Sequence, residues 1–469
     1  MKKGSGRAMP AQDDYQSFLA AKTPKPLATG CEPLPMPDRA FDFQAACADF
    51  AIRQGRAGIY LDTGLGKSAI QAIWAQNAAE ATNGRSLILT PLAVAQQMRR
   101  ECEAFGYEAR VIREQPEAGP GINICNYDRI DKIDPDEFGG VSLDEASVLK
   151  SIASKTRATL TRMFRDHRFK LCATATPAPN DHMELGQQAD FLGVMSSNEM
   201  LSRFFINDTS TASQKWRLKG HAHEPFWDWL ASWSRMASSP DDLGYDGSRF
   251  VLPPLEVVRH RTIGDVKIQA EGLFADLVSA TSMHDVKRQT VEARADKAAE
   301  VVLAEPDEAW IVWCDTDYEA DAVKARLPGA IEVRGSHSID KKEASIEAFL
   351  SGQALVMITK PSIMGYGLNL QHCARAMFVG RTFSYEAWYQ AVRRNWRFGQ
   401  TRPVIVHLIV AEGEDQIGRA IDRKSDDHER MKREMTKAMR RAMGKSSSRM
   451  VGYNPTHIME LPSWLKSVV

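Results

Sequence analysis

The sequence lacks any segment that would place the chain in a membrane or carry it across one. No uninterrupted apolar run approaches the roughly 18 residues that a membrane-spanning helix needs. The N-terminal residues Lys2, Lys3 and Arg7 are basic, but no apolar segment of the kind found in secretion signals follows them. We therefore expect a soluble protein that is not exported and has no membrane partner.

Cysteine is scarce and scattered. Seven cysteines lie between Cys31 and Cys373, an odd number without a C-x-x-C pair, so neither a disulfide-stapled scaffold nor a zinc ribbon is expected. His221 and His223 are close together, but no cysteine or third histidine clusters with them, and we interpret them as loop histidines rather than metal ligands. The pattern indicates a protein of the reducing cytoplasm.

Net charge is also absent. The 60 Lys and Arg residues are balanced by 60 Asp and Glu residues, so any affinity for nucleic acid must come from local basic patches rather than from the global field. The chain has 469 residues, of which 43% are hydrophobic. That is enough for at least two domains with cores of their own.

A glycine-rich segment is the first feature that indicates chemistry. Residues 63–68 read Thr-Gly-Leu-Gly-Lys-Ser after a short apolar run. Backbone N–H groups near the two glycines can close around phosphates, Lys67 adds a positive charge, and Ser68 can reach magnesium. The strict phosphate-loop pattern has another glycine where this chain has Leu61, and an ordinary turn is the alternative. Gln44, just ahead of the loop, is placed to read an adenine edge with its amide or is simply a helix residue.

Two adjacent acids follow another apolar run. Residues 141–143 lead into Asp144 and Glu145. A pair at the carboxyl end of a strand suits two tasks, with Asp144 holding magnesium and Glu145 orienting or deprotonating the attacking water. Exposed acids that cap a strand are the alternative, but an open α/β sheet keeps its ligand site at this edge. The hydroxyls of Thr174 and Thr176, at the end of the next strand, are expected to link the acid pair to neighbouring elements.

Apolar runs alternate with helical patterns in both halves of the chain. In the first half, strands are expected at 86–90, 107–112, 122–127, 141–144 and 169–177, with helices at 41–53, 69–76 and 92–105. In the second half, strands are expected at 309–314, 331–335, 354–359, 376–379 and 404–410, with helices at 317–327 and 341–349. This spacing predicts an α/β fold of parallel sheets with helices on both faces.

Residues 198–250 interrupt this rhythm. The stretch holds four tryptophans between Trp216 and Trp233 and no clear strand. We expect a mostly helical insertion or hinge whose aromatic side chains pack it onto a domain, and contact with nucleic acid through interleaved basic residues is the alternative. Residues 251–255 mark a domain boundary, because two prolines end what precedes them.

An arginine-rich segment lies near the end of the second half. Gln390, Arg394 and Arg397 are spaced at i, i+4 and i+7, so a helix would place them on one face. Such a face can stabilise charge on a transferring phosphoryl group from across a cleft. A solvated basic face is the alternative, which fits poorly with a position between a Gly-Asn loop and the strand at 404–410.

The C-terminal tail is expected to be a basic helix over residues 418–449. Methionines recur at four-residue spacing from Met431 to Met443, and such a stripe is typical of a packing surface. The pairs at 432–433 and 440–441 are the best candidate for a patch that binds the phosphate backbone, with a plain solvated face as the alternative.

Together these segments resemble superfamily 2 helicases and translocases, and most closely the Swi/Snf-type branch found in phage and bacterial proteins. The matching pieces, in the family's order, are Gln44, TGLGKS at 63–68, TP at 90–91, LDEAS at 143–147, TATP at 174–177, GYGLNL at 365–370 and QAVRRNWRFGQ at 390–400. The missing first glycine of the phosphate loop is usual in that branch. The resemblance implies two RecA-like lobes with ATP between them and DNA across both.

The resemblance also implies an organisation and a set of site residues. The domains would be a lead-in at 1–38, an ATP-binding lobe at 39–197, the insertion at 198–250, a second lobe at 251–417 and the basic tail at 418–469. The implied ATP-binding residues are Gln44, Thr63, Gly64, Leu65, Gly66, Lys67, Ser68, Asp144, Gly367 and Gln390. Of these, Ser68 and Asp144 would hold magnesium. The implied catalytic residues are Lys67, Glu145, Arg394 and Arg397. Of these, Glu145 would activate water, and Arg394 and Arg397 would act as arginine fingers. Thr90, Asn126 and Thr359 would lie near the DNA backbone.

Two departures from the family pattern affect the expected activity. Ser147 stands where the family usually has a histidine, a position at which the coupling of hydrolysis to movement can differ. The insertion is short beside those of large remodelling enzymes, which argues against activity on nucleosomes.

We therefore expect a DNA-dependent ATPase that translocates along duplex DNA in a bacterial or phage-infected cell. The nearest alternative is a strand-separating helicase with the same engine, although no residue clearly supplies a separation wedge. A non-catalytic DNA-binding accessory protein and a metabolic phosphate-loop kinase are disfavoured by the full set of site residues and by the second lobe. No nuclease or methyltransferase constellation is evident in the sequence, so such an activity would come from a partner protein.

Overall fold

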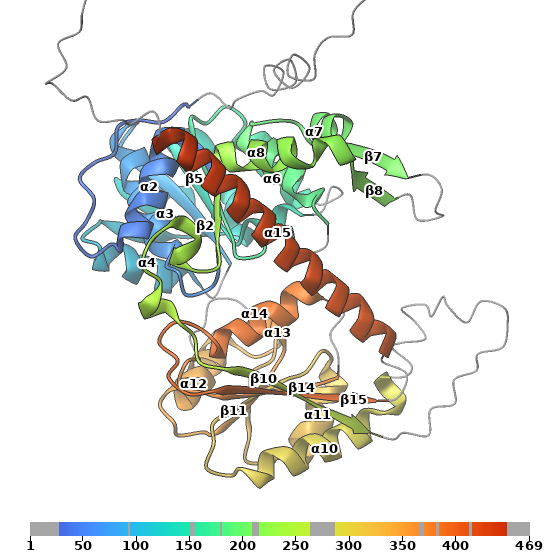
Figure 1. Ribbon diagram of the computed structural model, residues 1–469. Helices are drawn as coiled ribbons and strands as arrows, with labels where there is room; N and C mark the ends of the chain where they lie inside the picture. The colour runs from blue at the N-terminus through green and yellow to red at the C-terminus, as the bar shows by residue number, and fades with distance from the viewer. Residues whose placement is uncertain are drawn as a thin grey trace, which may run out of the picture.

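The computed structural model describes residues 28–91, 94–150, 155–178, 181–208, 215–262, 287–364, 370–380, 384–411 and 415–447. Within these ranges the chain forms two lobes, each built on a parallel sheet flanked by helices (Figure 1). Gly367, most of the 365–370 segment and most of the lead-in lie outside the described residues. No helix in the described part of the chain combines the length and apolarity that a membrane crossing requires.

The first lobe is organised around a seven-stranded sheet in the order β3-β4-β2-β5-β6-β1-β9, and all neighbours are parallel. Its strands are β1 (Arg56–Leu61), β2 (Arg85–Thr90), β3 (Ala109–Ile112), β4 (Gly121–Asn126), β5 (Gly140–Asp144), β6 (Phe169–Ala173) and β9 (Ser234–Ala237). Its helices are α2 (Asp42–Gln54), α3 (Lys67–Glu80), α4 (Ala95–Ala104), α5 (Lys155–Met163), α6 (Glu184–Leu192), α7 (Ser197–Phe204) and α8 (His223–Trp233). The central strands β5 and β6 are buried along their whole length, as expected of strands covered on both faces.

The prediction that residues 198–250 contain no clear strand is wrong. Strands β7 (Phe205–Asp208) and β8 (Lys215–Leu218) pair as an antiparallel hairpin, and β9 joins the first sheet beside β1. The sequence of β9, Ser-Arg-Met-Ala, contains no β-branched or aromatic residue, so its strand state is set by pairing with β1 rather than by local propensity. Trp229 and Trp233 are buried in the core of the first lobe, which confirms that these aromatic side chains pack the segment onto a domain.

The second lobe contains a six-stranded parallel sheet in the order β10-β15-β14-β11-β13-β12. Its strands are β10 (Leu255–Thr262), β11 (Trp310–Trp313), β12 (Ile331–Glu332), β13 (Val356–Thr359), β14 (Arg375–Val379) and β15 (Val404–Ala411). Its helices are α10 (Val291–Ala304), α11 (Asp317–Arg326), α12 (Ile339–Leu350), α13 (Pro361–Met364) and α14 (Tyr385–Asn395). Strand β10 begins directly after Pro253 and Pro254.

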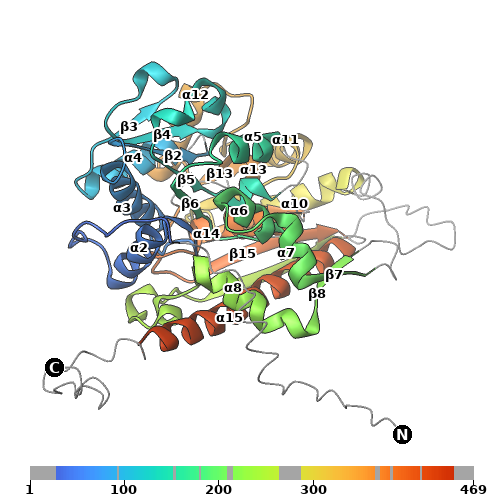
Figure 2. The same cartoon turned by 90° about the horizontal axis from the view of Figure 1, so that it is seen from above.

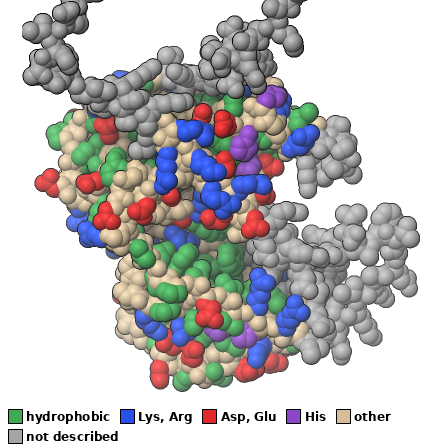
Figure 3. Space-filling view, in the orientation of Figure 1, with side chains coloured by type: hydrophobic (Ala, Val, Ile, Leu, Met, Phe, Trp, Pro, Cys, Tyr) green, Lys and Arg blue, Asp and Glu red, His purple; other side chains and the backbone are tan. Residues whose placement is uncertain are grey.

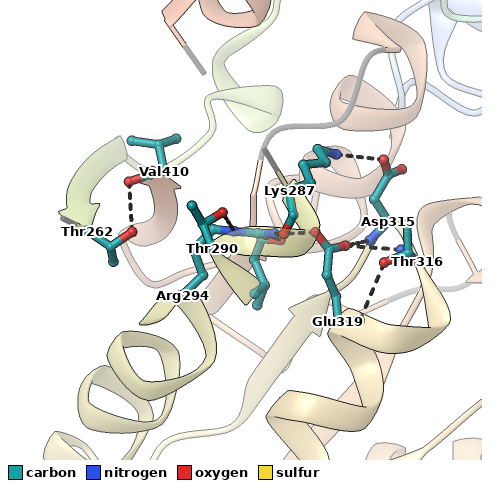
Figure 4. A network of polar contacts seen from close by, with 9 residues as sticks. Thr262, Lys287, Thr290, Arg294, Asp315, Thr316, Glu319 and Val410 are labelled. Carbon is teal, nitrogen blue, oxygen red and sulfur yellow. Dashed lines mark hydrogen bonds and ion pairs between the residues drawn. The ribbon is translucent and has the colours of Figure 1, made fainter. Parts of the chain in front are cut away.

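A buried polar network organises the carboxyl edge of the second sheet (Figure 4). Arg294 of α10 is fully buried and donates to the Glu319 carboxylate at 2.6 Å and to the Val379 carbonyl at 2.6 Å. Glu319 also accepts hydrogen bonds from the backbone N–H groups of Asp315 at 2.9 Å and Thr316 at 3.0 Å, just ahead of α11. These charge-assisted bonds join α10 and α11 to the end of β14.

The last described helix, α15 (Asp415–Ser447), runs from the second lobe across the first and lies beside α8 (Figures 1 and 2). Met431, Met435 and Met439 are buried in the core of the first lobe. This confirms the packing role predicted for these three members of the methionine stripe. The tail helix therefore connects the two lobes a second time.

The basic residues of α15 differ in their surroundings. Figure 3 shows Lys and Arg side chains gathered on the face of the first lobe that α15 crosses, with acidic side chains among them. Lys432 is only 7% exposed and pairs with Asp62, so its predicted place in a phosphate-binding patch is wrong. Arg441 pairs with Asp228 at 2.7 Å, whereas Arg433 is exposed. Helical spacing alone does not distinguish a lysine that faces solvent from one that reaches a buried carboxylate.

Candidate nucleotide site between the lobes

The predicted phosphate loop connects β1 to α3. Gly64 and Gly66 have φ angles of +95° and +76°, a region that L side chains adopt only with strain. A Cβ on Gly66 would lie 2.1 Å from the Gln44 amide nitrogen, and one on Gly64 would lie 3.0 Å from the Phe398 nitrogen. Because α3 begins at Lys67, the unpaired N–H groups of its first turn are directed at the loop, as in anion-binding sites.

Gln44 lies against the loop, but both ends of its amide are engaged by the chain itself. The side-chain oxygen accepts a hydrogen bond from the Phe41 N–H at 3.2 Å, and the nitrogen donates to the Leu65 carbonyl at 3.1 Å. Gln44 therefore braces the phosphate loop in this structure. Its predicted contact with adenine stays a prediction and requires these bonds to be exchanged.

The acid pair follows β5, at the same edge of the sheet as the phosphate loop. Asp144 accepts a hydrogen bond from Gln71 Nε2 at 2.9 Å, and its carbonyl accepts one from the Tyr127 hydroxyl at 2.7 Å. Glu145 has φ of +54° and is the one non-glycine residue with positive φ in the described ranges. Thr174 Oγ1 donates to Glu145 at 3.3 Å, as predicted. The buried Thr176 hydroxyl has no hydrogen-bond partner among the described residues, so the link predicted through Thr176 is wrong. Backbone strain of this kind persists where the surrounding structure holds a side chain in a required orientation.

Burial and mutual repulsion tune the two acids. Burial, followed by the neighbouring Asp144 carboxylate, raises the pKa of Glu145 to about 7. Burial also raises the pKa of Asp144 and lowers that of Lys67. A carboxylate with a pKa near neutrality is suited to accept a proton from water.

The arginine helix α14 brings second-lobe side chains to this acid pair. Gln390 Nε2 donates to the Glu145 carboxylate at 3.4 Å, and Arg394 donates to the Gln390 side-chain oxygen at 3.1 Å. The predicted one-turn relationship of Gln390 and Arg394 is therefore confirmed. The two lobes meet at Glu145.

Arg397 does not lie on that helix, so its predicted i+7 placement is wrong. The helix ends at Asn395, because Trp396 leaves the helical conformation with φ of −93° and ψ of 82° and donates its ring N–H to the Pro253 carbonyl at 2.7 Å. Arg397 nevertheless lines the same cavity as Arg394. The turn after the helix, rather than the helical face, brings it there.

A cavity of about 180 Å³ collects most of the predicted nucleotide-site residues from both lobes. Among its lining residues are Thr63, Gly64, Gly66, Lys67, Ser68, Asp144, Glu145, Arg394 and Arg397. Burial and the nearby Arg394 and Arg393 lower the pKa of Arg397 to about 10. Crowded cations of this kind favour an anionic ligand such as a phosphate chain.

The donor set also fits magnesium. In the described ranges no group of three or more His, Cys, Asp or Glu side chains forms a metal site by itself. Ser68 and Asp144 line the same cavity, and hydroxyl and carboxylate oxygens are ligands that magnesium takes together with phosphate oxygens and water. These two residues therefore fit a magnesium ion that arrives with a nucleotide.

The three residues predicted to approach DNA lie at strand ends but differ in exposure. Thr90 and Asn126 end the paired strands β2 and β4, and their side chains are 3.5 Å apart. Thr359 ends β13 in the other lobe, and its hydroxyl donates to the Val333 carbonyl at 3.0 Å. Thr90 and Thr359 are 0% and 2% exposed, so of the three only Asn126 is partly exposed. Contact with DNA stays a prediction for all three.

Several residues of this region were not singled out by any sequence pattern. Arg393 donates to the Thr63 carbonyl at 2.8 Å, although the helical-face interpretation placed its neighbour Arg394 at the site and passed over Arg393. Gln71 and Tyr127, which hold Asp144, come from other elements of the first lobe. A buried glutamine one turn into α3 resembles any other helix residue in a sequence.

Comparison with known protein families found none that matches this chain, and no curated protein matches its sequence. Function is therefore inferred from the cavity between the lobes and from the residues that line it.

Proposed function

We propose that the protein is an ATP hydrolase of the superfamily 2 helicase and translocase type, in the Swi/Snf-type branch, with two RecA-like lobes. In this proposal it couples hydrolysis to movement along duplex DNA. The observation that carries the proposal is the single cavity in which a phosphate loop and an acid pair from one lobe face two arginines from the other. A kinase that binds its nucleotide within one lobe would not need the two arginines from a second lobe.

Each lining group has a role in this proposal. The glycines and Lys67 bind the β- and γ-phosphates, while Ser68 and Asp144 hold magnesium, which neutralises phosphate charge when bound. Glu145 orients the attacking water and accepts its proton. Arg394 and Arg397 stabilise the negative charge on the phosphoryl group as it is transferred.

Contacts across the cleft support coupling between hydrolysis and lobe movement. Besides the bonds of Gln390 and Arg393, Lys150 of the first lobe forms an ion pair with Glu386 of the second. A nucleotide that bridges the lobes strengthens this closed arrangement, and hydrolysis removes the bridge. Alternating closure and opening would move the lobes stepwise along one DNA strand.

One observation favours a strand-separating helicase as a second candidate. The hairpin β7–β8 projects from the first lobe (Figure 1), and Ile206 on it is exposed. An apolar side chain on a projecting hairpin is the kind of feature that can separate paired bases.

Displacement of a third DNA strand tests the proposal and separates the two candidates. The protein is given ATP and a duplex that carries a triplex-forming strand, and a forked duplex is tested in parallel with Glu145→Gln as the control. ATP-dependent release of the third strand without fork opening is expected of a duplex translocase. Fork opening would favour the helicase, and ATP hydrolysis that releases neither strand would contradict translocation.

A further inference from the structure

Asp62 directly follows β1, and its backbone hydrogen-bonds to the phosphate loop that comes after it. Its N–H donates to the Ala237 carbonyl at 3.0 Å, and its own carbonyl accepts from the Leu65 N–H at 3.3 Å and from Lys67 Nζ at 3.4 Å. A displacement of Asp62 therefore moves the loop and the lysine that binds phosphate.

The side chain of Asp62 joins two other elements to the loop. One carboxylate oxygen accepts a hydrogen bond from the Tyr389 hydroxyl at 2.6 Å, and the other accepts one from Lys432 Nζ at 3.1 Å. The Arg393 guanidinium lies 3.8 Å from the carboxylate. Burial alone would raise the pKa of Asp62, but Lys432 and Arg393 outweigh it and lower that pKa. The buried carboxylate is therefore held in its charged form.

The partners of Asp62 lie on two different helices, α14 and α15. Lys432 lies on α15 next to Met431, which is buried in the core of the first lobe, and its ammonium also lies 5.4 Å from the centre of the Tyr389 ring on α14. Tyr389 and Arg393 lie on α14 and move with the second lobe. A separation of the lobes would remove these two contacts from Asp62, whereas the anchoring of α15 in the first lobe would leave Lys432 beside it. A buried carboxylate without any partner would be strongly unfavourable.

We propose that Asp62, Tyr389 and Lys432 are positioning residues of the ATP site. Asp62 binds Tyr389 and thereby fixes α14 against the phosphate loop. Lys432 holds the Asp62 carboxylate in the position in which it accepts that contact. The proposal rests on the ATPase function proposed above. Tyr389 and Arg393 are one helical turn apart and contact Asp62 and Thr63. Two such contacts fix both the height and the rotation of α14, which directs the adjacent Arg394 into the cavity.

Steady-state ATP hydrolysis by variants of the full chain tests the proposal. Tyr389→Phe removes one hydroxyl and should lower kcat about tenfold, the value of one ordinary hydrogen bond, while KM for ATP stays within about twofold. Lys432→Met should lower kcat similarly, and Lys432→Arg should restore most of it. The control Lys437→Met changes an exposed lysine of the same helix and should leave both constants unchanged. Wild-type kcat in Tyr389→Phe and Lys432→Met, or an equal loss in Lys437→Met, would overturn the proposal.

A second readout does not depend on hydrolysis. Small-angle X-ray scattering without nucleotide should give a larger radius of gyration for the double variant Tyr389→Phe/Lys432→Met than for the wild type, because the lobes separate more readily. Equal radii would overturn the positioning role. If the wild type hydrolyses no ATP but its radius of gyration is still smaller than that of the double variant, the proposed function is contradicted and the contact between α14 and the loop is supported.

Discussion

The guanidinium of Arg393 in the second lobe donates to the carbonyl of Thr63 in the phosphate loop of the first lobe, at 2.8 Å. These residues are 330 positions apart in the chain, and the neighbouring Arg394 lines the same cavity as Lys67 and Glu145. In the proposed function, this direct contact between the arginine helix and the phosphate loop would let one lobe respond to a ligand bound on the other.

Replacement of Lys67 by alanine is expected to reduce ATP turnover by a factor on the order of a thousand or more, because a charge placed on the transferred phosphate is lost. Steady-state phosphate release measures this. Lys297→Ala, which changes a partly exposed lysine paired with Glu300, is the matched control and should turn over ATP normally. Full activity in Lys67→Ala would refute the assignment of the site.

Replacement of Arg394 by alanine is expected to lower kcat by a factor on the order of a thousand, the usual value of an arginine finger. Nucleotide binding, measured by fluorescence with a labelled ATP analogue, should weaken far less, because the phosphate loop is intact. Arg402→Ala is the control, since this arginine is 48% exposed and pairs with Glu308. Similar losses of kcat in Arg394→Ala and Arg402→Ala would contradict a specific role of Arg394 in the chemical step.

The activity is expected to rise with pH through a value near 7. Burial and Asp144 raise the pKa of Glu145 to about 7, so below that pH the carboxyl group is protonated and cannot accept a proton from water. The pH profile of kcat/KM reports this group in the free enzyme. The profile should level off above pH 8, and Glu145→Gln should be nearly inactive at every pH. A rate that is highest at pH 5 would contradict the role of Glu145 as a base.

Loss of the buried ion pair in the second lobe is expected to destabilise the protein. Glu319→Ala leaves the buried Arg294 guanidinium without its carboxylate and should lower the free energy of unfolding of that lobe by about 3–5 kcal/mol. Urea unfolding followed by circular dichroism measures the change. Glu292→Ala removes a carboxylate that is 69% exposed and pairs with Arg326, and it should cost less than about 1 kcal/mol. Equal costs would show that burial does not set the strength of these pairs.

Local patterns predicted the parts of the site that lie within one continuous segment. The glycines and Lys67 belong to one turn, and the acid pair to one strand end, so sequence spacing alone was sufficient. The link between Asp62 and Lys432 spans 370 positions and has no local signature, because any lysine on an amphipathic helix looks the same before the helix is packed.

Tertiary contacts also overrode local patterns at the ends of elements. Strand β9 forms because it pairs with β1 at the edge of the first sheet. Helix α14 ends before Arg397 because the ring N–H of Trp396 donates to the Pro253 carbonyl. The threonines expected near DNA are at the predicted strand ends, but the burial of Thr90 and Thr359 depends on neighbouring strands. Spacing predicts which residues share an edge of a sheet and does not predict which of them face solvent.

Steady-state ATP hydrolysis in the presence of different polymers tests the central claim most directly. The rate is measured with no nucleic acid, with duplex DNA, with single-stranded DNA and with RNA, and Glu145→Gln serves as the control for contaminating activity. The account predicts strong stimulation by duplex DNA and a negligible rate for the variant. A rate that no polymer changes would contradict the DNA-dependent ATPase, and stronger stimulation by single strands would contradict movement along duplex DNA.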